Sequence, residues 1–98
     1  MSGPSQPKVE GEEWSDERIK AFLDLQPRDD TAPDYHVLKE AYQYMLPEFF
    51  ARFVPFFVAA GRNIDAQNQE GETLLARIQG FAKSGAYCEV LKANGAKV

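Results

Sequence analysis

Few side chains in this sequence are suited to nucleophilic, acid-base or metal chemistry. The chain has one histidine, His36, and one cysteine, Cys88. A zinc site needs several nitrogen, sulfur or oxygen ligands, and one residue of each kind does not supply them. Cys88 stands beside Tyr87 in an apolar helical segment, where a small core residue is the expected role. We therefore expect no metal, no cofactor and no catalytic role at either position.

Adjacent acidic residues are the remaining candidates for chemistry. Glu12 and Glu13 stand in a polar tail, and Asp29 and Asp30 stand in a linker between prolines. Both pairs should face water, whereas general acid-base catalysis needs a carboxyl group held in a cleft. The glycines are spread out as helix ends and turns, so no glycine-rich phosphate loop is present. These features predict a protein that is not an enzyme.

Length and composition indicate one small domain. The chain has 98 residues, 44% of them hydrophobic and 12% aromatic, which is enough for a core without metals or disulfides. A single cysteine cannot form a disulfide within the chain, which suits a reducing compartment. No apolar run is long enough to span a membrane, and the first residues do not resemble a signal peptide. We expect a soluble, cytoplasmic protein that does not enter membranes.

Charge makes nucleic acid an unsuitable partner. The net charge is −4 and the pI is about 4.9, whereas binding to a phosphate backbone depends on clustered lysine and arginine. Basic residues prevail only near the C-terminus, where residues 77–98 hold four basic side chains and one acidic side chain. These basic residues are scattered, so a solvated surface is the favoured interpretation. The alternatives are an acidic partner and the acidic N-terminal part of the same chain.

The N-terminal third predicts a tail, a helix and a linker. Residues 1–12 are almost free of apolar side chains, so we expect a disordered acidic tail before a single helical domain at 13–98. Ser15 is a suitable N-cap for a helix over 15–25, which has to end before Pro27. Residues 27–34 are turn-forming residues and predict a linker.

Helical spacing of apolar residues continues through the rest of the chain. We expect a helix capped by Asp34 and ending at Leu46, and a second helix that begins at Pro47 and stops at Gly61. Pro55 predicts a kink or a late start in the second helix. Further helices are expected over 73–82 and 86–94, the latter ending at Gly95.

Two segments end alike and indicate an internal repeat. Residues 53–64 and 87–98 each run from an aromatic residue through a helix to a glycine, and Gly61 and Gly95 are 34 residues apart. The ankyrin period is about 33 residues. The stretch 61–75 resembles the ankyrin finger and the helix start after it, in which Gly-Ala-Asp-Val-Asn-Ala leads to Gly-x-Thr-Pro-Leu-His. The matching positions are Gly61, Ile64, Asp65, Ala66, Gly71, Thr73, Leu75, Gly95, Ala96 and Val98.

The resemblance covers residues 34–98 and has departures. Leu74 replaces the usual proline and Ala76 the usual histidine, and the unit that begins at Asp34 lacks Thr-Pro-Leu-His. The resemblance implies an all-α fold, a short ankyrin-like stack of two helix-turn-helix units with an N-terminal capping helix. The whole chain also resembles a family of small proteobacterial proteins, which implies no particular activity.

The resemblance implies a non-enzymatic protein-protein interaction module, because ankyrin-like stacks usually bind proteins through their fingers and first helices. The expected partner is an unidentified protein, and the chain itself is expected to be a monomer or a weak homodimer. Five phenylalanines surround one helix, so at least one ring should point away from the main core. Core packing is still the favoured interpretation, and the alternative is that Phe49 or Phe53 belongs to an exposed patch that binds a partner. The candidate partner-binding residues are Asn63, Ile64, Asp65, Gln67, Tyr35, Tyr42, Phe49 and Phe53.

A second class of function stays open at this point. The aromatic residues Phe50, Phe53 and Phe57 predict, in this alternative, a pocket for an apolar ligand in a small carrier or sensor. A closed core with an exposed groove beside Ile64 favours the interaction module, whereas an internal cavity lined by these phenylalanines favours the carrier.

Overall fold

The computed structural model describes residues 13–97, and this part of the chain is helical. Its elements are α1 (Asp16–Lys20), the 3-10 helix η1 (Ala21–Asp24), α2 (Pro33–Tyr44), α3 (Pro47–Ala59), α4 (Leu74–Ile78) and α5 (Gly85–Ala93). No strand forms within 13–97, where pairing is limited to one isolated bridge between Gln67 and Thr73. The all-α prediction is confirmed, whereas the predicted tail at 1–12 lies outside the described residues. None of the described helices is long and apolar enough to cross a membrane.

The helix starts follow local capping chemistry. Ser15 caps α1 as predicted, because its hydroxyl accepts a hydrogen bond from the Arg18 amide at 3.1 Å. Pro47 is the first residue of α3, also as predicted. The prediction that Asp34 caps its own helix is wrong. Helix α2 begins one residue earlier, at Pro33, whose fixed φ suits a first helical position.

Helices α3 and α5 end with the same hydrogen-bond pattern at a glycine. Gly61 has a φ of 83° and Gly95 a φ of 100°, the left-handed conformation that ends a helix at little cost only for glycine. In each case the residue after the glycine donates its amide to a carbonyl in the last helical turn. These bonds are Arg62 N to Phe57 O at 3.3 Å and Ala96 N to Leu91 O at 3.0 Å.

Helix α3 runs through Pro55 without a late start. The proline removes the amide that would bond to the carbonyl of Ala51. Both Pro55 and Ala51 are exposed, so water can satisfy that carbonyl. The helix therefore tolerates the proline because it lies on the solvent side.

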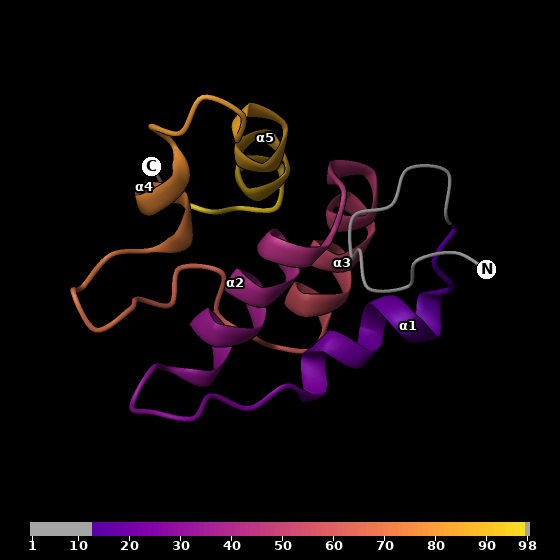
Figure 1. Ribbon diagram of the computed structural model, residues 1–98, viewed down its shortest axis with the longest axis horizontal. Helices are drawn as coiled ribbons and strands as arrows, with labels where there is room; N and C mark the ends of the chain where they lie inside the picture. Colours follow the sequence, from indigo (N-terminus) through magenta and orange to yellow (C-terminus); the bar gives the residue numbers. More distant parts are fainter. Residues whose placement is uncertain (1–12, 98) are drawn as a thin grey trace.

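The helices pack as two neighbouring pairs. Helix α2 contacts α3, and α4 contacts α5; between the pairs, α3 contacts α5 and α2 contacts α4. Helix α1 lies on α3 and η1 on α2, and Figure 1 shows α1 and α5 on opposite sides of α3. The N-terminal helical segments therefore cover the first pair on the side away from the second.

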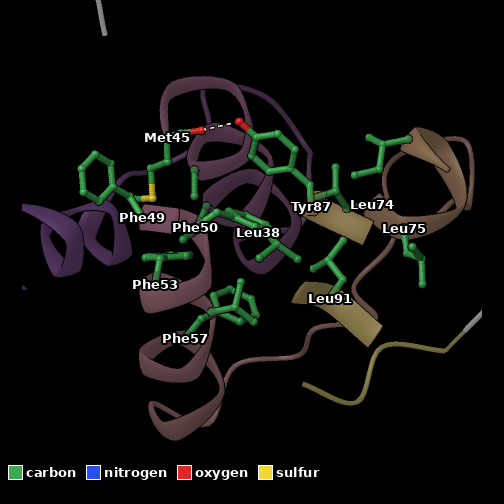
Figure 2. Close-up of a cluster of buried hydrophobic side chains, with 14 of the residues drawn as sticks. Leu38, Met45, Phe49, Phe50, Phe53, Phe57, Leu74, Leu75, Tyr87 and Leu91 are labelled. Carbon is green, nitrogen blue, oxygen red and sulfur yellow. Dashed lines mark hydrogen bonds between the residues drawn. The ribbon is translucent and has the colours of Figure 1, made fainter. Parts of the chain in front are cut away.

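The core lies between these pairs and is aromatic. Phe50, Phe53 and Phe57 of α3 are fully buried and lie with Leu38 of α2 and Leu91 of α5 (Figure 2). At the other side of α3, the rings of Trp14 and Phe49 stack with centroids 5.5 Å apart, which attaches the N-terminal segment. One hydrophobic cluster thus extends from residue 14 to residue 91.

Helix α4 is shorter than the prediction of 73–82. Thr73 caps it, since its hydroxyl accepts from the Ala76 amide at 3.1 Å, but the helix ends at Ile78. The chain then turns, with Phe81 N donating to the Ile78 carbonyl at 2.9 Å and Ser84 N donating to the Phe81 carbonyl at 3.2 Å. These turns move Phe81 out of the helical register.

Candidate functional site

A hollow of about 340 Å³ lies between α2 and α4, and we call it the α2–α4 groove. Its aromatic and aliphatic lining consists of Tyr35, Tyr42, Leu74, Ile78 and Phe81, and its polar lining consists of Lys39, Gln43 and Arg77. Lys39 follows Tyr35 by four positions, and Tyr42 and Gln43 follow Lys39 by three and four, so these residues lie on one side of α2. The groove is therefore built by the first helices of the two pairs.

Tyr42 is held in place at one side of the groove. Its hydroxyl lies 2.6 Å from the Ser84 hydroxyl, and its ring packs edge-on against Tyr87 with centroids 4.8 Å apart. Ser84 is only 2% exposed, so this polar contact is shielded from water. The ring of Tyr42 therefore presents a fixed surface to the groove.

Tyr35 connects the groove to the loop between α3 and α4. The ring is buried, and the hydroxyl accepts a hydrogen bond from Asn68 Nδ2 at 3.4 Å. The Asn68 side chain also accepts bonds from the amides of Glu70 and Glu72, both at 2.9 Å. One asparagine thus fixes the tip of the loop and attaches it to the rim of the groove.

Phe81 is the most exposed large hydrophobic residue in the described part of the chain. Its exposed fraction is 52%, although it stands beside the apolar lining of the groove. A phenylalanine ring in water costs free energy that burial against another surface would recover. The Phe81 ring therefore offers an apolar surface at the groove edge that no other side chain of the described residues fully covers.

The only charged residues in the lining of the groove are basic. Lys39 Nζ lies 3.9 Å from a carboxylate oxygen of Glu40, and Arg77 Nη1 lies 3.4 Å from Glu72. Each pair is partly or largely exposed, and such surface ion pairs stabilise by only about 0–1 kcal/mol. Both cations can therefore exchange these partners for a ligand at little cost.

A second hollow, of about 440 Å³, adjoins the first and is mostly polar. It lies between the linker and α2, it contains His36 and Arg28, and Lys39 lines both hollows. Asp29 in its wall accepts a hydrogen bond from the Thr31 amide at 2.9 Å, and hydrogen bonds from Thr31 lower the pKa of the Asp29 carboxyl. Within residues 13–97, no group of three His, Cys, Asp or Glu side chains could hold a metal ion.

The predicted partner-binding residues lie in three different environments. Tyr35 and Tyr42 line the groove. Phe49 and Phe53 are 4% and 0% exposed, so they pack in the core as favoured, and the alternative of an exposed patch is wrong. Phe49 stacks on Trp14, and Phe53 packs on Phe57, so neither ring can contact a partner from this position.

The four predicted loop residues have mainly structural contacts. Asn63 donates its amide to Asp34 and accepts a bond from the Asp65 amide, and Asp65 accepts a bond from the Lys97 amide. Ile64 is partly buried against the core and lines neither hollow, so the groove does not lie at the predicted position beside Ile64. The side chain of Gln67 is exposed. The side chains of Asn63 and Gln67 remain accessible at the surface.

The core does not favour the carrier alternative. Phe50, Phe53 and Phe57 line neither of the two hollows. They pack on other rings instead, with centroids 5.3 Å apart for Phe50 and Tyr87 and 6.0 Å for Phe53 and Phe57. Neither hollow therefore matches the aromatic pocket that the carrier alternative requires.

Sequence reasoning missed Lys39, Gln43, Arg77 and Phe81. A signal existed for the first two, because they follow Tyr35 at helical spacing on the same face of α2. The exposure of Phe81 was missed because the predicted helix over 73–82 includes this residue, whereas α4 ends at Ile78. The position of Arg77 in the groove depends on how α2 and α4 pack, and no local pattern contains that information.

Comparison of the chain with models of known protein families, with curated proteins and with solved structures finds no match. The function of the groove therefore has to be inferred from its own residues.

Proposed function

We propose that this chain is a non-enzymatic protein-interaction module of the cytoplasm, in which a short ankyrin-like stack binds a segment of a partner protein in the α2–α4 groove. The observation that carries this proposal is the half-exposed Phe81 ring at the edge of a groove formed with Tyr42. Aromatic side chains that complete a concave surface are typical hot spots of protein interfaces.

The pairing of the helices supports the ankyrin-like part of the proposal. First helices contact first helices and second helices contact second helices, as in a linear stack of repeats. Both second helices also end at a glycine with positive φ, at the spacing of 34 residues. The absence of Thr-Pro-Leu-His in the first unit means that the likeness is stronger in the second.

A repeated carboxylate contact also supports the stack. Asp34 Oδ2 accepts a hydrogen bond from the Asn63 amide at 2.8 Å, and Asp65 Oδ1 accepts one from the Lys97 amide at 2.9 Å. Each amide lies two residues after a helix-ending glycine. Each carboxylate near the beginning of one unit thus binds the backbone just after that unit's second helix.

The residues suited to chemistry support a function without catalysis. His36 is on α2 and Cys88 on α5, and Cys88 is buried. Burial raises the pKa of the Cys88 thiol, which lowers the fraction of the reactive thiolate. An unpaired cysteine also suits the reducing cytoplasm.

Since the N-terminal helices cover the stack within one chain, the module works as a monomer or a weak homodimer.

Selection from a phage-displayed library of short random peptides tests the groove. We expect peptides that bind the wild-type protein to lose about tenfold or more in affinity for Phe81→Ala, the loss of an aromatic hot spot. The matched control is Val58→Ala on α3, since Val58 is 40% exposed and does not line the groove. Circular dichroism establishes that both variants are folded. If no peptide is enriched, or if Phe81→Ala binds every enriched peptide as well as wild type, the groove is not the binding surface.

A further inference from the structure

The charge of the α2–α4 groove is opposite to the charge of the whole protein. The chain carries a net charge of −4, yet the charged side chains that line the groove are Lys39 and Arg77. Two other arginines, Arg52 and Arg62, form ion pairs within the chain. Arg52 binds Glu13 and Asp16, and Arg62 binds Asp34 and the Leu23 carbonyl. The two groove cations, in contrast, face a concave surface.

The present partners of the groove cations leave much of their bonding capacity unused. The 3.9 Å contact of Lys39 with Glu40 is at the limit of an ion pair. Arg77 uses Nη1 for Glu72, and a guanidinium has five N–H donors. Glu72 in turn also accepts a bond from Asn68 at 3.3 Å, so it is shared between two donors. An incoming carboxylate can bind to either cation without breaking a buried contact.

We propose that the segment bound by the groove belongs to a partner protein and carries an apolar side chain next to one or more acidic residues. This inference rests on the proposed function and specifies the chemistry of the partner. The apolar side chain packs against Phe81 and Tyr42, and the carboxylates pair with Lys39 and Arg77. The exposed amide of Gln43, on the same face of α2, is placed to hydrogen-bond the backbone of the segment.

The bound segment needs both the apolar side chain and the acidic residues to reach useful affinity. Surface ion pairs alone contribute little, and they mainly speed association and select the partner by charge. The apolar contact supplies most of the affinity, because it removes the Phe81 ring from water.

Charge reversal on both sides of the interface tests the inference. The probe is a fluorescein-labelled peptide from the phage-selected set, compared by fluorescence anisotropy with two counterparts in which its acidic residues are replaced by glutamine or by lysine. We expect about a tenfold or larger loss of affinity for Lys39→Glu/Arg77→Glu with the acidic peptide. The lysine counterpart should recover affinity for that variant. Lys92→Glu is the matched control, because Lys92 is an exposed cation on α5 outside both hollows.

The outcomes separate the inference from the proposed function. If the enriched peptides lack acidic residues but still require Phe81, the groove binds peptides and the charge inference is wrong. The inference also fails if the double variant binds the acidic peptide as wild type does, or if a labelled thymidine oligonucleotide binds the groove more tightly than the peptide. If neither Phe81 nor the two cations affect any peptide, both proposals are refuted.

Discussion

Replacement of Tyr87 by phenylalanine tests whether a hydrogen bond from Tyr87 stabilises the packing of the α4–α5 pair on the α2–α3 pair. The Tyr87 hydroxyl donates to the Met45 carbonyl at 2.6 Å, between residues 42 positions apart (Figure 2). Phenylalanine preserves the ring and its packing on Phe50 and Tyr42, so the change removes only the hydroxyl. The Met45 carbonyl then loses a donor in a buried environment.

The size of the effect follows from the burial of this bond. Leaving a buried acceptor without its partner costs about 1–3 kcal/mol. Tyr87 is 7% exposed, so some water can reach the site, and we expect the free energy of unfolding to fall by about 1–2 kcal/mol. The matched control is Tyr44→Phe. Tyr44 is 41% exposed and its hydroxyl has no hydrogen bond within residues 13–97, so its replacement should change stability by less than about 0.5 kcal/mol.

Urea unfolding followed by tryptophan fluorescence measures the difference. Trp14 is the one tryptophan of the chain and is buried, so its emission reports loss of the core. The pH dependence gives an independent readout. Burial raises the pKa of Tyr87 above its ordinary value of 10.0. Above that pH the unfolded chain binds fewer protons than the folded chain, so the wild-type free energy of unfolding falls as pH rises.

The phenylalanine variant lacks this titrating group, so the stability difference between wild type and Tyr87→Phe should narrow above about pH 10. Equal stabilities of Tyr87→Phe and Tyr44→Phe at neutral pH would refute the reasoning. Such a result would mean that α5 is not held to the end of α2 by this bond.

Three further predictions concern single positions. Asp34→Ala should lower the free energy of unfolding by about 1–2 kcal/mol in urea titrations, because it removes the bonds to Arg62 and Asn63 that follow α3. Asp30→Ala, at an exposed position, should change it little. Gly61→Ala should lower the free energy of unfolding by about 1–2 kcal/mol, measured by thermal unfolding, because the φ of Gly61 is +83°. Gly80→Ala is the control, since Gly80 has no positive φ and no close neighbour; equal melting temperatures of the two variants would argue against a left-handed helix end at Gly61. Cys88 should react with a thiol reagent much more slowly in the folded than in the urea-unfolded protein, because burial raises its pKa, and equal rates would contradict the buried position.

Local patterns in the sequence were sufficient for most helix ends. The Ser15 cap, the start at Pro47 and the stops at Gly61 and Gly95 each depend on a few neighbouring residues, and all four occur in the structure. Asp34 shows the limit of this reasoning. Its side chain could bond the amides of its own helix, but the Asn63 amide lies 2.8 Å away in the fold and takes the carboxylate instead.

The surface was harder to predict than the core for a physical reason. Five phenylalanines on one helix leave open whether a ring of α3 is exposed, and the structure shows that neighbours on two sides bury Phe49 and Phe53. Helical periodicity identifies one buried face, but it does not reveal that α1 and α5 cover opposite sides of α3. The exposed ring occurs at Phe81, which the incorrect end of α4 had assigned to a helix.

The end of α4 is also what creates the groove. A helix continuing through Ala82 would place Phe81 three residues after Ile78, on the face that holds the buried side chains of α4. The turn over residues 79–84 instead exposes the Phe81 ring and brings Ser84 to the Tyr42 hydroxyl. The same turn therefore joins the second pair to the first and presents an aromatic ring beside two cations. Because core packing does not require this exposure, the groove, more than the loop at 63–67, is where we expect the partner to bind.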